Sequence, residues 1–333
     1  MVRLRTVSPS TPGWRRRRVG AGFSYVDEHG NRLDGEDVDR IKSLAIPPAW
    51  EDVWICPFPN GHIQAVGTDA AGRKQYLYHP DWRTKRDAMK FERVTDVARR
   101  LSRTRAAVLE HLSLDGMPVE RAAAAAVRLL DLGYFRIGSD VYADDNGSFG
   151  LTTLERRHVR RDGDRLVFEF VGKSGVEHSV EIDDRLSVSA VETMRRRRTK
   201  QDRLMAYKDG HRWALLDAER VNEYLRTTTG GEMTAKDFRT WHATVLAAAA
   251  LASSEEPGDT KASRQRAVRA AMIEVSEYLG NTPTIARSSY VDPRVIDQYE
   301  GGNTIAPVLR RRFRTPDEQQ AALERAVLRM LAG

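Results

Sequence analysis

The spacing of hydrophobic residues changes along the chain, from a period of two to a period near 3.6. Within residues 20–80, the stretch VWICPFPNGHIQAVGTDAAGRKQYLYH alternates apolar and polar positions and carries turn residues at Asn60-Gly61 and Gly72. This pattern predicts three strands, and a short helix is predicted before them over residues 35–44. Tyr76 and Tyr78 lie two positions apart in the last strand, so their side chains are expected on one face.

From about residue 87 onward, apolar residues recur every three to four positions, which predicts helices. The alanine-rich helix has Pro118 near its start and Gly133 after its end, where helices favour these residues. The predicted helices cover residues 91–112, 118–133, 189–207, 217–227, 235–253, 261–279 and 316–331.

A β-hairpin is predicted to interrupt these helices, because RLVFEFV and VEHSVEI are strand-like and flank the turn sequence G-K-S-G. Gly172-Lys173-Ser174 also matches the end of a phosphate-binding loop. That loop requires a glycine where this chain has Val167, and a helix must follow it. A nucleotide site at Lys173 is therefore excluded, and taken alone this lysine is best interpreted as a solvated turn residue.

The predicted fold is α+β, with a small N-terminal β-rich domain followed by a larger, mainly α-helical domain. The chain has 333 residues, which is typical of about two domains. We expect a flexible basic arm over residues 1–19, the β-rich domain over residues 20–84, and the helical domain over residues 85–333.

Composition narrows the possible partners of the chain. The net charge of +7 and the basic runs at residues 15–18, 195–198 and 310–312 favour a polyanion, with nucleic acid as the first candidate. The single cysteine, Cys56, excludes an internal disulfide and a cysteine-based zinc site. No run of 18 apolar residues indicates a membrane span, and the basic N-terminus is unlike a secretory signal, so a cytoplasmic, nucleoid-associated protein is expected.

Five blocks of sequence, taken in order, carry a resemblance to a known family. They are GRKQYLYH, YFRIGSDVY with FGLTTL after it, FVGKSGVEH, KDFRTWH and LGNTPTIARSSY. In this order and spacing they resemble the type IB DNA topoisomerases, in their compact poxvirus-like and bacterial form. The resemblance covers nearly the whole chain and implies the tyrosine recombinase and topoisomerase IB type of catalytic domain. It implies the catalytic residues Arg136, Lys173, Arg239, Asn281 and Tyr290.

The chemistry of these residue types suits strand transfer in DNA. Tyr290 can attack the phosphorus and conserve the bond energy as an aryl phosphodiester. Arg136 and Arg239 can stabilise the charge on the phosphorane, and Lys173 can protonate the departing 5′ oxygen. Many relatives carry His where this chain has Asn281, and Asn cannot donate a proton near neutral pH, so only a hydrogen bond to the phosphate is expected there.

The same resemblance implies contacts with double-stranded DNA outside the catalytic group. Glutamine can pair with adenine, and aromatic rings can pack against sugars or thymine methyl groups. A monomer that clamps the duplex between its two domains, without metal ion or other cofactor, is expected. The implied DNA-binding residues are Gln75, Tyr76, Tyr78, Lys85, Arg86 and Tyr142.

Two other functions fit parts of this pattern. A tyrosine site-specific recombinase uses similar chemistry, but usually has His-x-x-Arg where this chain has Lys236-Asp237-Phe238-Arg239. Residues 20–84 also lack the helical domain expected of a recombinase. A non-catalytic basic DNA-binding protein would explain the charge but would make the ordered catalytic residues accidental.

Overall fold

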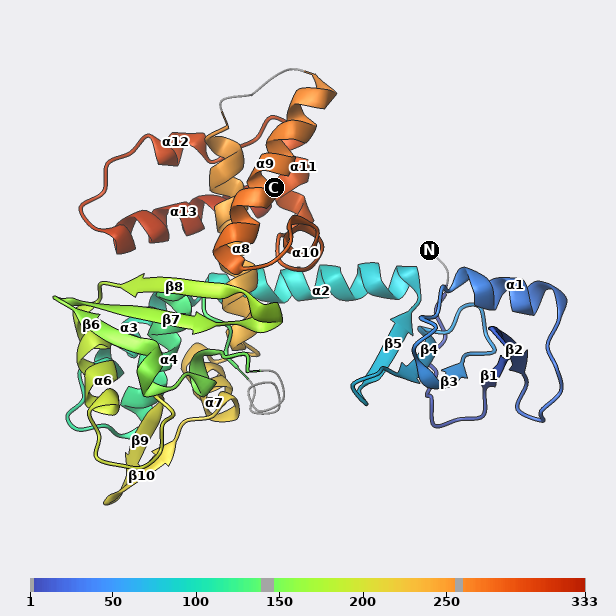
Figure 1. Cartoon of the computed structure of the whole chain (residues 1–333). Helices are drawn as coiled ribbons and strands as arrows, with labels where there is room; N and C mark the ends of the chain where they lie inside the picture. Colours follow the sequence, from blue (N-terminus) through green and yellow to red (C-terminus); the bar gives the residue numbers. More distant parts are fainter. Residues whose placement is uncertain (1–2, 139–146, 255–259, 333) are drawn as a thin grey trace. The chain divides into compact units, whose positions relative to one another are not determined.

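The computed structural model describes residues 3–138, 147–254 and 260–332. It divides into two compact units, Met1–Phe91 and Glu92–Gly333, and helix α2 (Pro80–Ala98) contains the boundary between them. Strands form the centre of the first unit and helices dominate the second (Figure 1). The predicted α+β class is therefore confirmed.

The smaller unit is built on a five-stranded sheet in the order β2-β1-β3-β4-β5, in which all neighbours are antiparallel. Side chains alternate along β3, so Val53 and Ile55 join one apolar cluster while Trp54 joins another on the opposite face. Ile41 of α1 is buried in the first cluster. The elements are β1 (Trp14–Val19), β2 (Gly22–Val26), α1 (Gly35–Ser43), β3 (Glu51–Ile55), β4 (Ile63–Thr68) and β5 (Lys74–Tyr78).

The flexible arm expected over residues 1–19 is wrong, because residues 14–19 form strand β1. Trp14 is buried in the core of the sheet, which anchors the strand. Arg16 donates hydrogen bonds to the carbonyl groups of Pro47 at 3.1 Å and Trp50 at 2.5 Å. Part of this basic run therefore holds the fold together, and the hydrophobic pattern of WRRRRV was too weak to predict a strand.

The larger unit surrounds helix α4, which is buried along most of its length (Figure 1). Its alanine run, residues 122–126, lets α3, α6, α7 and α8 approach closely on different sides. The helices are α3 (Leu101–Leu112), α4 (Val119–Gly133), α6 (Arg185–Arg195), α7 (Ala218–Thr229), α8 (Ala235–Ala252), α9 (Lys261–Leu279), α10 (Pro283–Ser289), α11 (Pro293–Glu300), α12 (Ala306–Leu309) and α13 (Pro316–Leu331).

Two small antiparallel sheets complete the larger unit, one of three strands and one of two. The predicted hairpin around Lys173 is confirmed: Phe170 pairs with His178, and Val171 with Glu177. The strands are β6 (Val159–Asp162), β7 (Arg165–Val171), β8 (Glu177–Ile182), β9 (Ala206–Asp209) and β10 (Arg212–Leu215).

The helix predicted over residues 189–207 is wrong in its second half. Helix α6 ends at Arg195, and residues 206–215 form the hairpin of β9 and β10. The guanidinium group of Arg197 is buried and donates to the carbonyl groups of Met194 and Leu204, at 2.8 and 2.9 Å. This side chain bridges the two ends of the connection between α6 and β9, an arrangement that helical periodicity does not reveal.

Within the described ranges, we find no helix that combines the length and the apolar character needed to cross a membrane.

Candidate active site

Arg136 lies just beyond the end of α4, where the chain changes direction. Tyr134 caps the helix in the left-handed conformation, with φ of 54°. The Arg136 guanidinium then reaches the turn after α9, where its Nη2 donates to the carbonyl oxygen of Gly280 at 3.0 Å and to Oδ1 of Asn281 at 2.5 Å. Burial lowers the pKa of Arg136, whereas Tyr290 raises it.

Arg239 comes from the first turn of α8, which begins with a capping box between Thr234 and Asp237. The Arg239 side chain is buried, and it donates to the main-chain carbonyl groups of Tyr134 and, at 2.6 Å, Leu279. Burial, followed by the positive charge of Arg136, lowers the pKa of Arg239 to about 10. The guanidinium therefore stays charged at neutral pH.

Tyr290, the predicted nucleophile, lies at the end of the short helix α10. Its ring centre lies 5.6 Å from Cζ of Arg239. Its segment is anchored to α8 by Thr244, whose hydroxyl accepts from the backbone N–H of Asp292 at 3.1 Å. The carbonyl oxygens of Thr240 and Tyr290 share the hydroxyl proton, at 2.8 and 3.3 Å. One buried threonine thus ties the tyrosine segment to the helix that bears Arg239.

Asn281 follows Gly280, which ends α9 in the left-handed conformation with φ of 57°. Its Oδ1 accepts from Arg136, and its Nδ2 is buried without a hydrogen-bond partner among the described residues. A buried amide donor costs free energy unless it finds an acceptor. Asn281 therefore presents an unused donor beside the two arginines.

Lys173 occupies the exposed turn between β7 and β8, as the hairpin prediction requires. Ser174 and Gly175 both have positive φ in this turn, at 65° and 75°. The preceding residue, Gly172, lines a cavity of about 30 Å³ together with Arg136 and Arg239. Four of the predicted residues, Arg136, Arg239, Asn281 and Tyr290, thus form one group, and the base of the Lys173 turn borders it.

Two family models match the chain. The model described as eukaryotic DNA topoisomerase I, catalytic core, matches residues 79–304, and the model described as bacterial DNA topoisomerase IB, N-terminal domain, matches residues 22–69. The chain belongs to the type IB DNA topoisomerases. The resemblance inferred from the five sequence blocks is confirmed.

Curated relatives carry the same family name. DNA topoisomerase 1B of Acanthamoeba polyphaga mimivirus is 28% identical over 293 residues, which are 86% of this chain and 87% of that protein. DNA topoisomerase 1B of vaccinia virus (strain Copenhagen) is 31% identical over 117 residues, which are 34% of this chain and 36% of that protein.

In the smaller unit of this topoisomerase, the residues predicted to contact DNA lie on β5 and at the start of α2. The rings of Tyr76 and Tyr78 stack with centres 6.0 Å apart, so their expected common face is confirmed. Cζ of Arg86 lies 5.5 Å from the ring centre of Tyr78, and the side chain of Lys85 is exposed. Gln75 donates from Nε2 to Asp69 at 2.8 Å, which fixes the orientation of its amide. The remaining predicted contact, Tyr142, lies outside the described residues.

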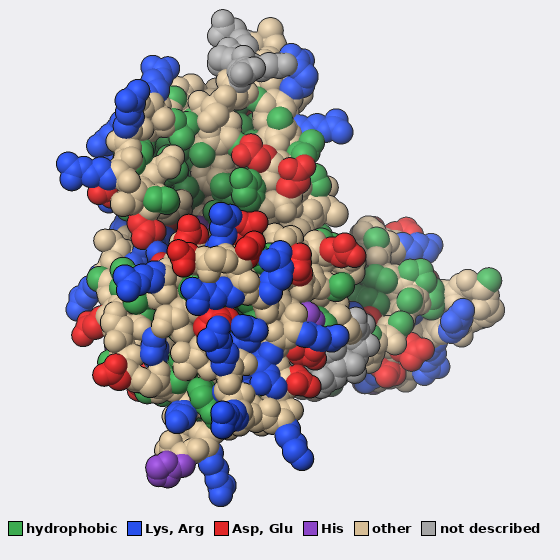
Figure 2. Space-filling model, turned by 60° about the vertical axis from the view of Figure 1, so that its left-hand side comes forward, with side chains coloured by type: hydrophobic (Ala, Val, Ile, Leu, Met, Phe, Trp, Pro, Cys, Tyr) green, Lys and Arg blue, Asp and Glu red, His purple; other side chains and the backbone are tan. Residues whose placement is uncertain are grey.

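The basic runs of the topoisomerase contribute less open positive charge than their sequence indicates. Arg195 and Arg196 both pair with Glu192, at 2.6 and 2.8 Å, and Arg197 is buried. Figure 2 shows Lys and Arg side chains interspersed with Asp and Glu side chains on one face. The run at residues 195–198 is thus partly neutralised, whereas Arg15, Arg17, Arg18 and the run at residues 310–312 are exposed.

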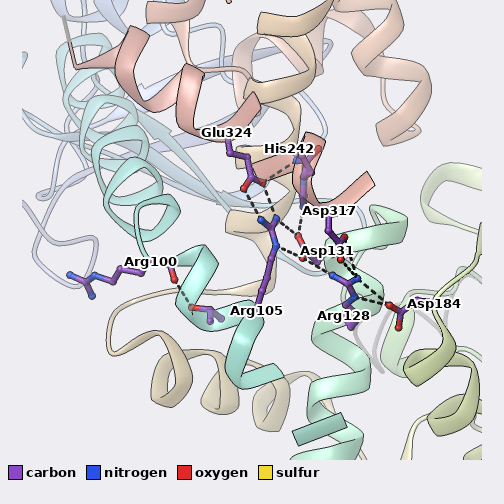
Figure 3. Close-up of polar contacts among 10 residues, drawn as sticks. Arg100, Arg105, Arg128, Asp131, Asp184, His242, Asp317 and Glu324 are labelled. Atoms are coloured by element: carbon purple, nitrogen blue, oxygen red, sulfur yellow. Dashed lines mark hydrogen bonds and ion pairs between the residues drawn. The ribbon is translucent and has the colours of Figure 1, made fainter. Parts of the chain in front are cut away.

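One turn along α8 from Arg239, His242 joins a buried ion-pair network (Figure 3). Its Nε2 lies 3.1 Å from Asp131 of α4. Arg105 of α3 donates to Asp131 and to Glu324 of α13, with shortest distances of 2.7 Å to each. Burial raises the pKa of Asp131, but hydrogen bonds from Arg105 and His242 outweigh it and hold the pKa well below its usual range. The network joins α3, α4, α8 and α13, and α8 also bears Arg239.

Three residues at the site were not predicted from the sequence: Tyr134, Thr244 and His178. Tyr134 acts through its backbone carbonyl and Thr244 through its side-chain hydroxyl. No local sequence pattern identifies such partners in advance. His178 could have been noticed, because the alternation in EHSVEI places it on the same face as the apolar Val180 and Ile182.

Proposed function

We propose that this topoisomerase relaxes supercoiled duplex DNA by breaking one strand through a 3′-phosphotyrosyl intermediate and then resealing it. The observation that carries the proposal is the convergence of Arg136, Arg239 and Tyr290, with the ring of Tyr290 5.6 Å from the Arg239 guanidinium. Supercoil torque drives rotation of the free strand, so the reaction needs neither ATP nor another energy source.

In the proposed cleavage step, Oη of Tyr290 attacks the phosphorus and its proton passes to solvent. A P–Oη bond forms and the P–O5′ bond breaks in line with it. Lys173 gives its ammonium proton to the departing 5′ oxygen, because an alkoxide is a poor leaving group. Religation reverses both bond changes: the 5′ hydroxyl attacks the phosphotyrosine, and its proton returns to Lys173. Tyr290 leaves and takes up a proton from solvent.

The arginines supply the positive charge that the phosphorane requires. Arg136 and Arg239 each retain N–H groups beyond those used on backbone carbonyls, since a guanidinium carries five donors. Asn281 adds a neutral donor through its unpartnered Nδ2. Donors positioned before the substrate arrives stabilise developing charge without further reorganisation, so no metal ion is required for this role.

The proposed substrate is double-stranded DNA, held by a monomer that clamps the duplex. Residues 20–84 would serve as the DNA-binding domain, with Gln75, Tyr76 and Tyr78 toward the bases and Lys85 and Arg86 toward phosphates. Residues 85–333 would serve as the catalytic domain. The stacked, partly exposed tyrosines of β5 support this assignment.

The two alternatives differ in their products. A site-specific recombinase joins new strand partners, and a non-catalytic protein leaves topology unchanged. The matches to topoisomerase models over both ends of the chain favour relaxation over either alternative.

The decisive experiment is plasmid relaxation with EDTA present and ATP absent, comparing the wild type with Tyr290→Phe. We expect Tyr290→Phe to bind DNA normally but to relax none of it, because the nucleophilic oxygen is lost. Tyr299→Phe is a matched control, since the buried Tyr299 hydroxyl has no hydrogen-bond partner among the described residues. Full activity of Tyr290→Phe would remove the nucleophile assignment.

A further inference from the structure

The imidazole of His178 fills the space between the hairpin that carries Lys173 and the turn that carries Asn281. A Cβ atom added to Gly172 would lie 2.6 Å from this ring, and one added to Gly280 would lie 2.5 Å from it. Real Cβ atoms do not approach other atoms so closely. The ring therefore touches the backbone of both segments at once.

Gly172 shows that the contact itself requires glycine. Its φ of −94° and ψ of −168° are open to any residue, so backbone conformation does not explain a glycine there. The close approach of the His178 ring explains it. Gly280 has two reasons to be glycine, because it also ends α9 with φ of 57°.

Neighbouring side chains hold the ring in this position. Phe170 stacks on it with ring centres 5.1 Å apart and an interplanar angle of 20°. The adjoining cavity of about 30 Å³ is lined by His178, Arg136 and Arg239, and is large enough for a water molecule but not for a substrate. The ring thus acts as a packed spacer and does not line a ligand pocket.

Burial and the neighbouring positive charges keep the His178 ring neutral. Burial lowers the pKa of His178, and the charges of Arg136 and Arg239 lower it further. An uncharged ring separates the two segments without adding a third cation beside the guanidinium groups.

We propose that His178 is a positioning residue that sets the separation between the Lys173 turn and the Asn281 turn, so that the lysine reaches the leaving oxygen of a phosphate held by the arginines. The inference rests on the proposed function, in which Lys173 is the general acid. If the ring is removed, the hairpin loses its spacer and the acid moves, while Arg239 keeps its backbone anchors at Tyr134 and Leu279.

The test measures single-turnover cleavage of two DNA substrates, one with the normal 5′ oxygen and one with a 5′ sulfur as leaving group. The sulfur departs without a proton, so a defect in acid delivery disappears with it. For His178→Ala we expect cleavage of the oxygen substrate to slow by about 10²-fold, the scale on which a misplaced catalytic group acts. On the sulfur substrate, His178→Ala should stay within about threefold of the wild type.

Three further variants sharpen the test. His178→Phe keeps a stacked ring and should cleave the oxygen substrate within about threefold of the wild type, since the proposed role is spacing. Gly172→Ala should displace the ring and reproduce the pattern of His178→Ala, which also keeps the test open if His178→Ala fails to fold. Ser179→Ala is the matched control, because Ser179 is the next residue of β8 and is exposed on its opposite face.

Lys173→Ala, run in parallel, separates the inference from the function on which it rests. If Lys173→Ala is not rescued by the sulfur leaving group, the acid assignment fails. If Lys173→Ala is rescued but His178→Ala is slowed equally on both substrates, the positioning role of His178 is wrong. Wild-type cleavage of the oxygen substrate by His178→Ala would overturn it as well.

Discussion

Arg136 holds Asn281 by its side-chain oxygen, through a hydrogen bond of 2.5 Å from Nη2 to Oδ1. With its oxygen held by the guanidinium, the amide has its nitrogen as the donor it can offer to a ligand. That nitrogen is buried and lacks a partner within the described part of the chain. The arginine thus contributes to the site twice, with its own charge and by orienting a neighbouring donor.

The orientation of Asn281 predicts the behaviour of two variants. Asn281→Ala should slow cleavage by about tenfold, the equivalent of one neutral hydrogen bond to the phosphate. Asn281→Asp should slow it by about 10²-fold or more, because a carboxylate beside Arg136 offers no donor and offsets the guanidinium charge. Single-turnover cleavage measures both, and the oxygen and sulfur leaving groups should be affected equally. Unchanged cleavage by Asn281→Ala would show that its Nδ2 does not contact the phosphate.

Thr244→Val tests the anchoring of the nucleophile segment. The substitution keeps the side-chain shape but removes the hydroxyl that accepts from the backbone N–H of Asp292. We expect a loss of about 1–3 kcal/mol in the free energy of unfolding, because a buried N–H is left unsatisfied. Cleavage should slow while DNA affinity is retained. The neighbouring Thr240→Val is a control, since its hydroxyl bonds within the helix, to Lys236.

The buried network around Arg105 should dominate the stability of the larger unit. Arg105→Met leaves the carboxylates of Asp131 and Glu324 without their main partner, which should cost about 3–5 kcal/mol in urea unfolding. Arg165→Met breaks an exposed pair with Glu181 and should have a much smaller effect on the free energy of unfolding. Equal losses for the two variants would mean that burial does not strengthen the network.

The histidine spacer predicts how stability depends on pH. The pKa of His178 is lower in the folded protein than in the unfolded chain, where it is about 6.5. As the pH falls below that value, the unfolded chain binds a proton that the folded protein excludes, so acid favours unfolding. The charged or titratable groups that line the same cavity as the ring are Tyr134, Arg136, Arg239 and Tyr278. His178→Phe should therefore lose less stability than the wild type between pH 7 and pH 5, and identical pH profiles would contradict the buried, neutral state.

DNA affinity should depend on which basic residues already have partners. Arg86→Ala should weaken binding and reduce the salt dependence of affinity by about one unit of slope, as expected for one phosphate contact. Arg196→Ala should change neither, because Arg196 pairs with Glu192 at 2.8 Å. Affinity measured across a salt series compares the two variants directly. A larger loss of DNA affinity for Arg196→Ala than for Arg86→Ala would place the DNA on the surface around Arg196.

Many of the helices and strands could be predicted from local sequence patterns. Helices α9 and α13 were predicted to the residue, because apolar stripes, caps and flanking polar turns all agree there. The hairpin at Lys173 was predicted from its turn sequence and alternating strands. Strand β1 was missed because its four consecutive arginines mask the alternation of apolar and polar residues. The hairpin of β9 and β10 was missed because the connection from α6 to β9 depends on the buried Arg197.

The sequence predicted which residues make up the site, but not the contacts that hold them in place. Arg136, Arg239, Asn281 and Tyr290 were identified by order and residue type, and the structure brings them together. Their supports, the carbonyl groups of Tyr134 and Leu279 and the hydroxyl of Thr244, come from distant segments. Such contacts depend on tertiary packing, which periodicity does not encode.

The guanidinium groups of Arg136 and Arg239 donate to neutral oxygens, among them the carbonyl groups of Tyr134, Leu279 and Gly280 and the side-chain amide of Asn281. Neutral dipoles hold a cation in place without cancelling it, as a carboxylate would. The pocket therefore stores an excess of positive charge before any DNA is present. We expect a DNA phosphate to be the anion that completes it. Recognition of the backbone and stabilisation of the reacting phosphorus would then follow from the same uncompensated charge.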